Sequence, residues 1–137
     1  MEEFNILVCD DDKSIVDAIE IYLKQENYNV IKAYNGLGAL QALEENEVHL
    51  ILLDIMMPQM DGMELIDNLR NDFATSHIPI VMITAKHEDD TQVRALKYGA
   101  DGYIAKPFTM ELVTARIDSV LDRRLTLMSR LSENRPA

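Results

Sequence analysis

The chain has 137 residues, of which 47% are hydrophobic and 27% are charged, and this length and composition predict one soluble domain with a single core. Its formal net charge of −11 argues against direct binding of nucleic acid, which depends on basic side chains. The N-terminus lacks the pattern of a signal peptide, and no apolar run approaches the roughly 20 residues of a membrane helix. We therefore expect a cytoplasmic protein with no membrane partner.

The predicted elements alternate between strands and helices along the chain. Apolar runs rich in β-branched residues predict strands over 5–9, 28–33, 48–53, 78–83 and 103–105. Helices are expected after Asp12, over 38–45, after the capping-box pattern at Asp61, around 91–98, and after Thr109. This alternation, with right-handed crossovers, predicts an α/β fold: a three-layer αβα sandwich around a doubly wound, five-stranded parallel sheet of flavodoxin-like order 2-1-3-4-5.

Four of the predicted strands end on polar side chains. These are the aspartates at 10–12, Asp54, Thr84 and Lys106. Because the carboxyl ends of parallel strands meet at one edge of a sheet, we expect these groups to converge in the crevice where open α/β sheets bind ligands. Carboxylates, a hydroxyl and an ammonium together describe a site for a divalent cation and a phosphate.

The adjacent aspartates have different expected roles. Asp12 is best placed to cap the following helix, which leaves Asp10 and Asp11 facing the crevice. With Asp54 they form an all-oxygen cluster that suits Mg²⁺, or Mn²⁺ in its place. Soft metals are disfavoured: Cys9 is expected to be a buried hydrophobe, and the scattered histidines are expected on the surface or in loops. These histidines are His49, His77 and His87.

Asp54 is the candidate nucleophile. It follows four aliphatic residues, it cannot cap a helix that starts seven residues later, and the loop after it exposes it at the sheet edge. A carboxylate beside a bound cation can attack phosphorus, because the metal offsets the charge of the incoming group. Thr84 and Lys106 are then placed to hold phosphoryl oxygens.

Several motifs together resemble the receiver domain of two-component response regulators, the CheY-like superfamily. The matching runs are 6–12 (ILVCDDD), 53–62 (LDIMMPQMDG), 83–85 (ITA) and 99–108 (GADGYIAKPF), and the resemblance covers about 5–122. It implies that Asp54 accepts a phosphoryl group from a phosphohistidine on a sensor histidine kinase. It also implies that Asp11, Asp54 and the Met56 carbonyl bind Mg²⁺, with Asp10 acting through a water.

The resemblance further assigns the response to phosphorylation. It implies that Lys106 pairs with the acyl phosphate, that Thr84 moves to hydrogen-bond it, and that Tyr103 then rotates inward. A cis peptide is expected before Pro107. The signal would be read on the surface of the fourth helix (91–98), the fifth strand and the fifth helix, which also suits a homodimer. The fourth helix should be loosely anchored, because Val93 and Leu96 are its few large apolar residues.

The expected domain organisation is a receiver domain over 1–122 and a C-terminal helix extension or linker over 123–137. The signal is expected to pass to a DNA-binding transcriptional effector, and the alternative is that the domain is the receiver of a hybrid histidine kinase or phosphorelay. In either case the domain is a signalling phosphoacceptor, with self-catalysed transfer and slow autodephosphorylation, and not an enzyme that turns over a substrate.

Two other classes are weighed against this interpretation. A phosphatase of the haloacid dehalogenase type also uses an aspartate nucleophile and Mg²⁺, but it expects a second aspartate two residues later, where this chain has Met56. A pseudo-receiver that only binds partners usually lacks acidic-site residues or the lysine, and here Asp10, Asp11, Asp54 and Lys106 are all present.

Overall fold

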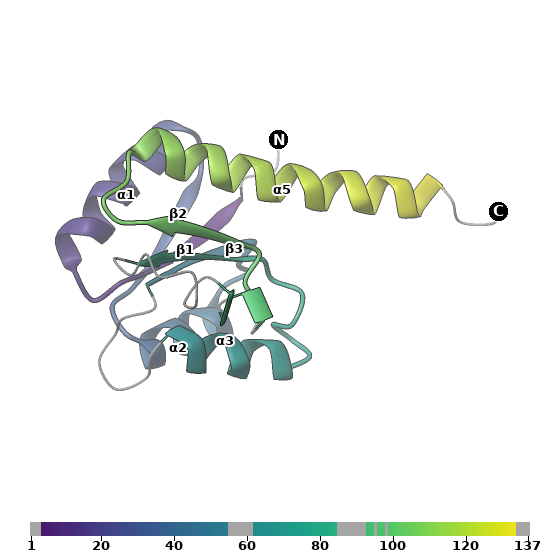
Figure 1. The fold of residues 1–137 in the computed structure, drawn as a ribbon, viewed down its shortest axis with the longest axis horizontal. Helices are drawn as coiled ribbons and strands as arrows, with labels where there is room; N and C mark the ends of the chain where they lie inside the picture. Colours follow the sequence, from purple (N-terminus) through teal and green to yellow (C-terminus); the bar gives the residue numbers. More distant parts are fainter. Residues whose placement is uncertain (1–3, 55–61, 85–92, 95, 98, 134–137) are drawn as a thin grey trace.

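The computed structural model describes residues 4–54, 62–84, 93–94, 96–97 and 99–133. The chain forms one sheet with helices on both faces (Figure 1). In chain order the elements are β1 (Asn5–Cys9), α1 (Lys13–Gln25), β2 (Asn29–Ala33), α2 (Gly36–Glu45), β3 (Leu50–Asp54), α3 (Gly62–Asn71), β4 (Ile80–Thr84), β5 (Gly102–Ala105) and α5 (Met110–Glu133).

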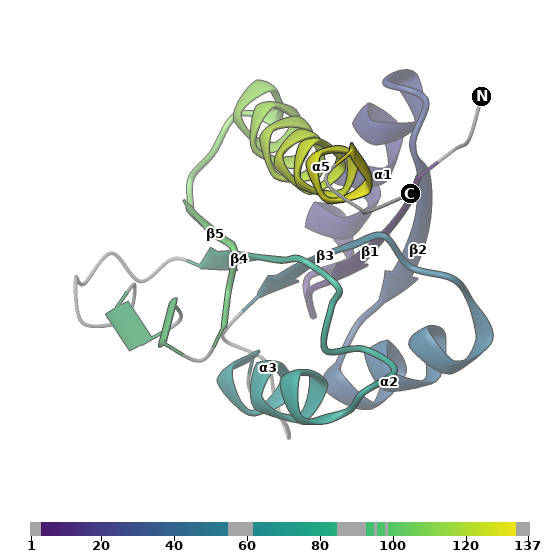
Figure 2. The same ribbon diagram turned by 90° about the vertical axis from the view of Figure 1, so that its right-hand side faces the viewer.

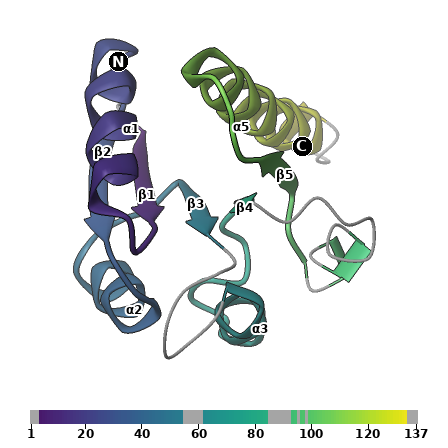
Figure 3. The same cartoon turned by 60° about the vertical axis from the view of Figure 1, so that its left-hand side comes forward.

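The five strands form a parallel sheet of order β2-β1-β3-β4-β5. Helices α1 and α5 cover one face, and α2 and α3 cover the other, as Figures 2 and 3 show. The predicted three-layer flavodoxin-like fold and its strand order are therefore confirmed.

The core has two halves because the central strands are buried on both faces, as expected for a parallel sheet. Alternate residues of each strand point to opposite sides. Leu7, Ile51 and Met82 pack against α2 and α3, whereas Val8, Leu52 and Val81 pack against α1 and α5. This double burial explains why the strands are almost continuously apolar in sequence.

The predicted element bounds differ from the observed ones by one or two residues. Val48 and Ile78 are buried but precede β3 and β4, and the Ile78 amide donates instead to the Thr75 carbonyl at 3.1 Å. Both strands also run one residue further than predicted and include Asp54 and Thr84. The apolar pattern marks buried residues, and in β3 and β4 the buried segment begins two residues before the strand itself.

Side-chain caps set the start of three helices. Asp12 accepts hydrogen bonds from the amides of Ser14 and Ile15. Asn35 accepts from the Gly38 amide at 2.7 Å, so α2 begins at Gly36 and not at the predicted Gly38. Thr109 Oγ1 accepts from the Leu112 amide at 3.1 Å. The caps predicted at Asp12 and Thr109 are thus observed, while Asp61 lies outside the described residues.

Helix α5 continues beyond the rest of the fold (Figure 1). Its backbone is helical through Glu133, which lies within the segment 123–137 that was expected to be a helix extension or linker. Among the described helices, none is both long enough and apolar enough to cross a membrane.

Candidate functional site

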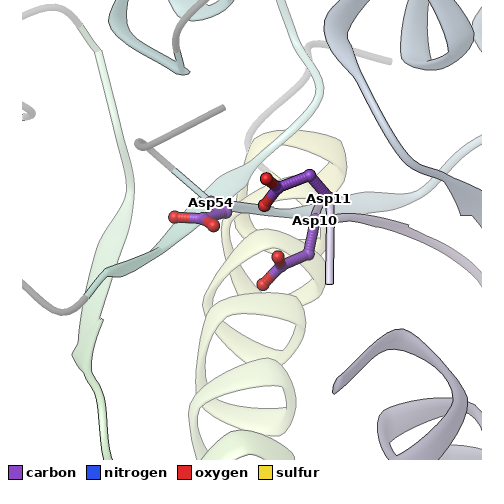
Figure 4. Close-up of side chains that lie close together, drawn as sticks. All are labelled: Asp10, Asp11 and Asp54. Atoms are coloured by element: carbon purple, nitrogen blue, oxygen red, sulfur yellow. The ribbon is translucent and has the colours of Figure 1, made fainter. Parts of the chain in front are cut away.

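Three carboxylates gather at the carboxyl edge of the sheet, as Figure 4 shows. Asp10 and Asp11 follow β1, and Asp54 is the last residue of the neighbouring strand β3. One carboxylate oxygen from each lies within 4.8 Å of the other two. Asp10 and Asp54 are only 3% and 5% exposed, whereas Asp11 is exposed to solvent. The cluster is therefore buried on one side and open on the other.

Lys106 joins the two buried carboxylates. Its Nζ donates to Asp10 Oδ2 at 3.0 Å and to Asp54 Oδ2 at 3.4 Å. Burial works against the charge of the ammonium, but the hydrogen bond to Asp10 and the negative charge of Asp54 outweigh it and raise the pKa of Lys106 above its ordinary value. The lysine is therefore charged at neutral pH and partly neutralises the cluster.

The backbone fixes where this lysine begins. The Lys106 amide donates to the Thr84 carbonyl at 2.8 Å, which ties the end of β5 to the end of β4. The peptide bond between Lys106 and Pro107 is cis. Asp10 is held from the other side, because its Oδ1 accepts from the Asp12 amide at 2.9 Å.

The donor set of the cluster suits a hard cation. Carboxylate oxygens are the ligands that Mg²⁺ and Mn²⁺ prefer, and one face of the cluster remains accessible through Asp11. Cys9 lies next to the cluster in sequence, but burial and then the neighbouring carboxylates raise the pKa of its thiol to about 12. A protonated thiol is a poor metal ligand, so the residues present fit Mg²⁺ and not a soft metal.

The described histidines lie away from this edge. His49 precedes β3, its Nδ1 accepts from the Asn5 amide at 2.9 Å, and its ring packs edge-on against Phe4. His77 is exposed in the turn after α3. His87 lies outside the described residues.

Thr84 lies on β4, the strand next to Asp54, and Tyr103 lies on β5, one strand further along the sheet. Asp54 pairs with Ile83 across β3 and β4, so Thr84 is one residue further toward the carboxyl edge, and it is fully buried. Tyr103 lies on β5 opposite Met82, partly buried against the α2–α3 half of the core, and burial raises the pKa of its hydroxyl.

Two further predictions concern segments that are described in part or not at all. Met56 lies outside the described residues. In the predicted helix 91–98 only 93–94 and 96–97 are described, and there Val93 and Leu96 are 47% and 56% exposed.

An apolar hollow of about 550 Å³ opens beside the lysine, between α1 and the start of α5. Its lining residues are Ser14, Ile15, Ala18, Lys106, Pro107, Phe108 and Met110. This hollow was not predicted from the sequence. Its one signal was the apolar pair Pro107-Phe108 directly after the candidate lysine.

The role of Arg70 was also not predicted from the sequence. Its guanidinium donates to the carbonyls of Ser76, Ile78 and Gly99, and it forms an ion pair with Asp101 at 2.9 Å. These contacts join the end of α3 to the segments that lead into β4 and β5. The available signal was its isolation, because it is the single lysine or arginine between Lys32 and Lys86.

Comparison with known proteins agrees with this arrangement. Residues 6–118 match the family model of the response regulator receiver domain. Among solved structures, a CheY-like receiver domain protein from Methanospirillum hungatei JF-1 is 30% identical with a TM-score of 0.85, and the match covers 91% of this chain and 98% of that one. A two-component response regulator from Clostridium difficile is 31% identical with a TM-score of 0.84, covering 89% and 98%.

The chemotaxis protein CheY4 of Vibrio cholerae is similar at 27% identity, with a TM-score of 0.83 and coverage of 87% of this chain and 99% of that one. The family match runs from the second residue of β1 through β5 and includes the acidic cluster. The chain therefore belongs to the family of response regulator receiver domains.

Proposed function

We propose that this domain accepts a phosphoryl group on Asp54 from the phosphohistidine of a sensor histidine kinase, in the presence of Mg²⁺. The observation that carries the proposal is the grouping of Asp10, Asp11 and Asp54 within 4.8 Å, with Lys106 donating to two of them. A signalling phosphoacceptor needs such a site, and a partner-binding module does not.

In the proposed transfer, an oxygen of the Asp54 carboxylate attacks phosphorus. The new P–O bond forms as the P–N bond to the donor histidine breaks, and the histidine nitrogen keeps the bonding electron pair. Asp10, Asp11 and Asp54 would hold Mg²⁺, together with the Met56 carbonyl, which lies outside the described residues. When bound, the cation offsets the negative charge that accumulates between the carboxylates and the phosphoryl group.

Lys106 supplies the second positive charge. Its ammonium is already within 3.4 Å of Asp54, so a phosphoryl group on that carboxylate could take over the hydrogen bond without a large movement of the lysine. Thr84, at the end of the adjacent strand, would donate its hydroxyl to another phosphoryl oxygen. Tyr103 would then turn further inward and change the surface formed by 91–98, β5 and α5.

The hollow beside Lys106 suits the approach of the kinase. A phosphohistidine that donates its phosphoryl group to Asp54 must arrive over the carboxyl edge, and Ile15, Phe108 and Met110 offer apolar contact next to it. Ala18 is an exposed small residue on this surface. Ala18→Glu should slow transfer from a phosphorylated histidine kinase and leave transfer from a small phosphodonor unchanged.

The output is proposed to follow from the altered surface. Helix α5 extends past residue 118, where the family match ends, by 15 residues, which correspond to roughly 22 Å of helix. This segment would connect the receiver to an effector, such as a DNA-binding domain, or contribute to a homodimer. A receiver of a hybrid histidine kinase would keep the same phosphorylation site and lack phosphorylation-dependent self-association. Sedimentation with and without beryllofluoride distinguishes these two outputs.

The phosphorylation proposal is tested by incubation with a small phosphodonor and Mg²⁺, followed by intact-mass measurement. The wild type should gain one phosphoryl group, and the gain should be lost in Asp54→Ala, in Asp11→Ala and after chelation of the metal. Asp122→Ala, an exposed carboxylate on α5, is the matched control and should behave as the wild type. Phosphorylation of Asp54→Ala at the wild-type rate would refute the assignment, and turnover of a phosphoester would point to a phosphatase.

A further inference from the structure

Helices α2 and α3 cover the sheet face opposite α1 and α5 (Figure 2). A groove of about 490 Å³ is lined by residues of both helices and of the turn after α3. Its apolar part is formed by Leu40, Leu43, Leu69 and Ala74. Its polar rim is formed by Glu44, Asn68, Asp72 and Thr75. Two neighbouring helices with apolar side chains between them form a groove into which a third helix can pack.

Phe73 projects from the turn that closes one end of this groove. Its side chain is 96% exposed, although phenylalanine is among the residues most often buried. The residues on either side of it, Asp72 and Ala74, both line the groove. An aromatic side chain at the edge of an apolar groove is a typical anchor of protein interfaces.

The turn that carries Phe73 is internally hydrogen-bonded. Asp72 accepts from the Ala74 amide at 3.0 Å through its side chain and from the Ser76 amide at 2.8 Å through its carbonyl. Thr75 Oγ1 donates to the Leu69 carbonyl at 2.8 Å, and Arg70 donates to the Ser76 carbonyl at 3.1 Å. These hydrogen bonds fix the backbone of the turn that presents Phe73, which lowers the entropic cost of using this residue in binding.

The charged side chains that line the groove, Glu44 and Asp72, are both acidic. Between Lys32 and Lys86 the sequence has a single lysine or arginine, Arg70, and its guanidinium is committed to Asp101 and three backbone carbonyls. The exposed carboxylates on this face include Glu44, Asp67 and Asp72. A second copy of the chain would bring like charges together, whereas a cationic partner would be attracted and oriented.

We propose that the α2–α3 groove and Phe73 dock a cationic amphipathic helix of a protein partner. Leucine-like side chains of this helix would fill the groove between Leu40, Leu43 and Leu69, and its lysines or arginines would lie beside Glu44 and Asp72. Phe73 would pack over one end of the docked helix. Because α3 leads into the start of β4, this end of the groove lies toward the amino edge of the sheet, away from the acidic cluster. Docking therefore does not compete with phosphotransfer.

The chain contains no tryptophan, so Phe73→Trp introduces a single fluorescent reporter at the proposed contact. The probe is a synthetic helical peptide with leucines at i, i+3, i+4 and i+7 and lysines at its other positions. A peptide with glutamates in place of the lysines is the charge control. The lysine peptide should shift the tryptophan emission to shorter wavelength with one-to-one saturation and weaker binding at high salt, and the glutamate peptide should cause no shift.

Variants separate this groove from general adhesion to an acidic protein. Phe73→Ser should weaken binding of a labelled lysine peptide about tenfold. Glu44→Lys should weaken it about threefold at low salt. Ile21→Ser removes an apolar side chain that is 62% exposed on α1, on the opposite face, and should leave the affinity unchanged. Amide chemical-shift changes in the wild type should fall on α2, α3 and 72–75.

All measurements use the unphosphorylated protein, so their outcome does not depend on the phosphorylation of Asp54. Absence of binding by the lysine peptide overturns the proposal. So does equal loss of affinity in Ile21→Ser and Phe73→Ser, which would mean non-specific adhesion. Sedimentation that shows Phe73-dependent self-association of the wild type would replace the cationic partner with a second copy of the chain.

Discussion

Replacing Lys106 by methionine tests how the two buried carboxylates are stabilised. The substitution keeps most of the length and apolar character of the side chain and removes the ammonium. Asp10 and Asp54, which are 3% and 5% exposed, then lose the cation that donates to both of them. We expect the metal-free protein to become less stable, because buried like charges would remain with less compensation.

The size of the effect follows from the distances. At an effective dielectric constant of about 20, the attraction is roughly 5.5 kcal/mol at 3.0 Å and roughly 4.9 kcal/mol at 3.4 Å. Desolvation of the ammonium offsets a large part of this gross energy. Removal of one partner from a buried ion pair costs about 3–5 kcal/mol, and the 20% exposure of the lysine side chain favours the lower end of that range.

Mg²⁺ should compensate for the lost lysine. At 100 times its dissociation constant, an ion that binds only the folded state contributes about 2.7 kcal/mol. In the wild type a bound ion would share the carboxylates with Lys106, so Lys106→Met should bind Mg²⁺ more tightly than the wild type does. Each protein gains stability from the ion according to its own affinity, so tighter binding by Lys106→Met should make the stability difference between the two proteins smaller in saturating Mg²⁺ than in chelator.

Urea unfolding followed by circular dichroism, in chelator and in Mg²⁺, measures both quantities. Lys24→Met is the matched control, because Lys24 is 61% exposed and its pair with Glu20 at 3.4 Å should contribute less than about 1 kcal/mol. An unchanged urea midpoint for Lys106→Met in chelator would refute the reasoning on charge compensation. A large loss of Mg²⁺ affinity would show instead that the lysine supports the geometry of the carboxylates.

Three further variants or reactions test other parts of the fold. Arg70→Lys cannot reproduce the fork of hydrogen bonds to Ser76, Ile78 and Gly99, so urea unfolding should show a loss of about 2 kcal/mol; wild-type stability would contradict the role of the guanidinium. Gly99→Ala places a Cβ 2.9 Å from Arg70 Nε at φ 110° and should cost about 1–3 kcal/mol, whereas Gly102→Ala, whose nearest neighbour is at 3.5 Å, should be close to neutral. Cys9 should resist alkylation at pH 8 until urea unfolds the chain, because the thiol is 1% exposed and its pKa is about 12; rapid labelling of the native protein would contradict its burial.

The layered fold was predictable from the sequence because the three central strands are buried on both faces. Double burial requires nearly continuous apolar runs, which β1, β3 and β4 provide, and stretches with helical character separate them from each other and from the partly exposed edge strands β2 and β5. The convergence of Asp10, Asp54 and Lys106 also followed from topology, since parallel strands bring their carboxyl ends to one edge. The starts of β3 and β4 were wrong by two residues, because Val48 and Ile78 are buried in the segments before them.

Arg70 and Phe73 could not be assigned from the sequence for a physical reason. The partners of Arg70 are mostly backbone carbonyls, which every residue has, so no residue pattern marks them. Phe73 belongs to a residue type that is usually buried, and its 96% exposure in the hydrogen-bonded turn after α3 is visible only in the structure. The roles of such residues depend on backbone geometry, so they can be assigned only from the structure.

The two edges of the sheet satisfy their charges in different ways. At the amino edge, Arg70 is held by backbone carbonyls and by Asp101, and Asp101 also accepts from the Ile80 amide at 2.8 Å. That arrangement uses groups that stay in place as long as the chain is folded. At the carboxyl edge, Asp10 and Asp54 share the ammonium of a flexible side chain, beside the exposed Asp11. A mobile ammonium can be redirected by a metal ion or a phosphoryl group at low cost, whereas a backbone carbonyl cannot. The amino edge is therefore suited to stability, and the carboxyl edge is suited to a reversible change of charge.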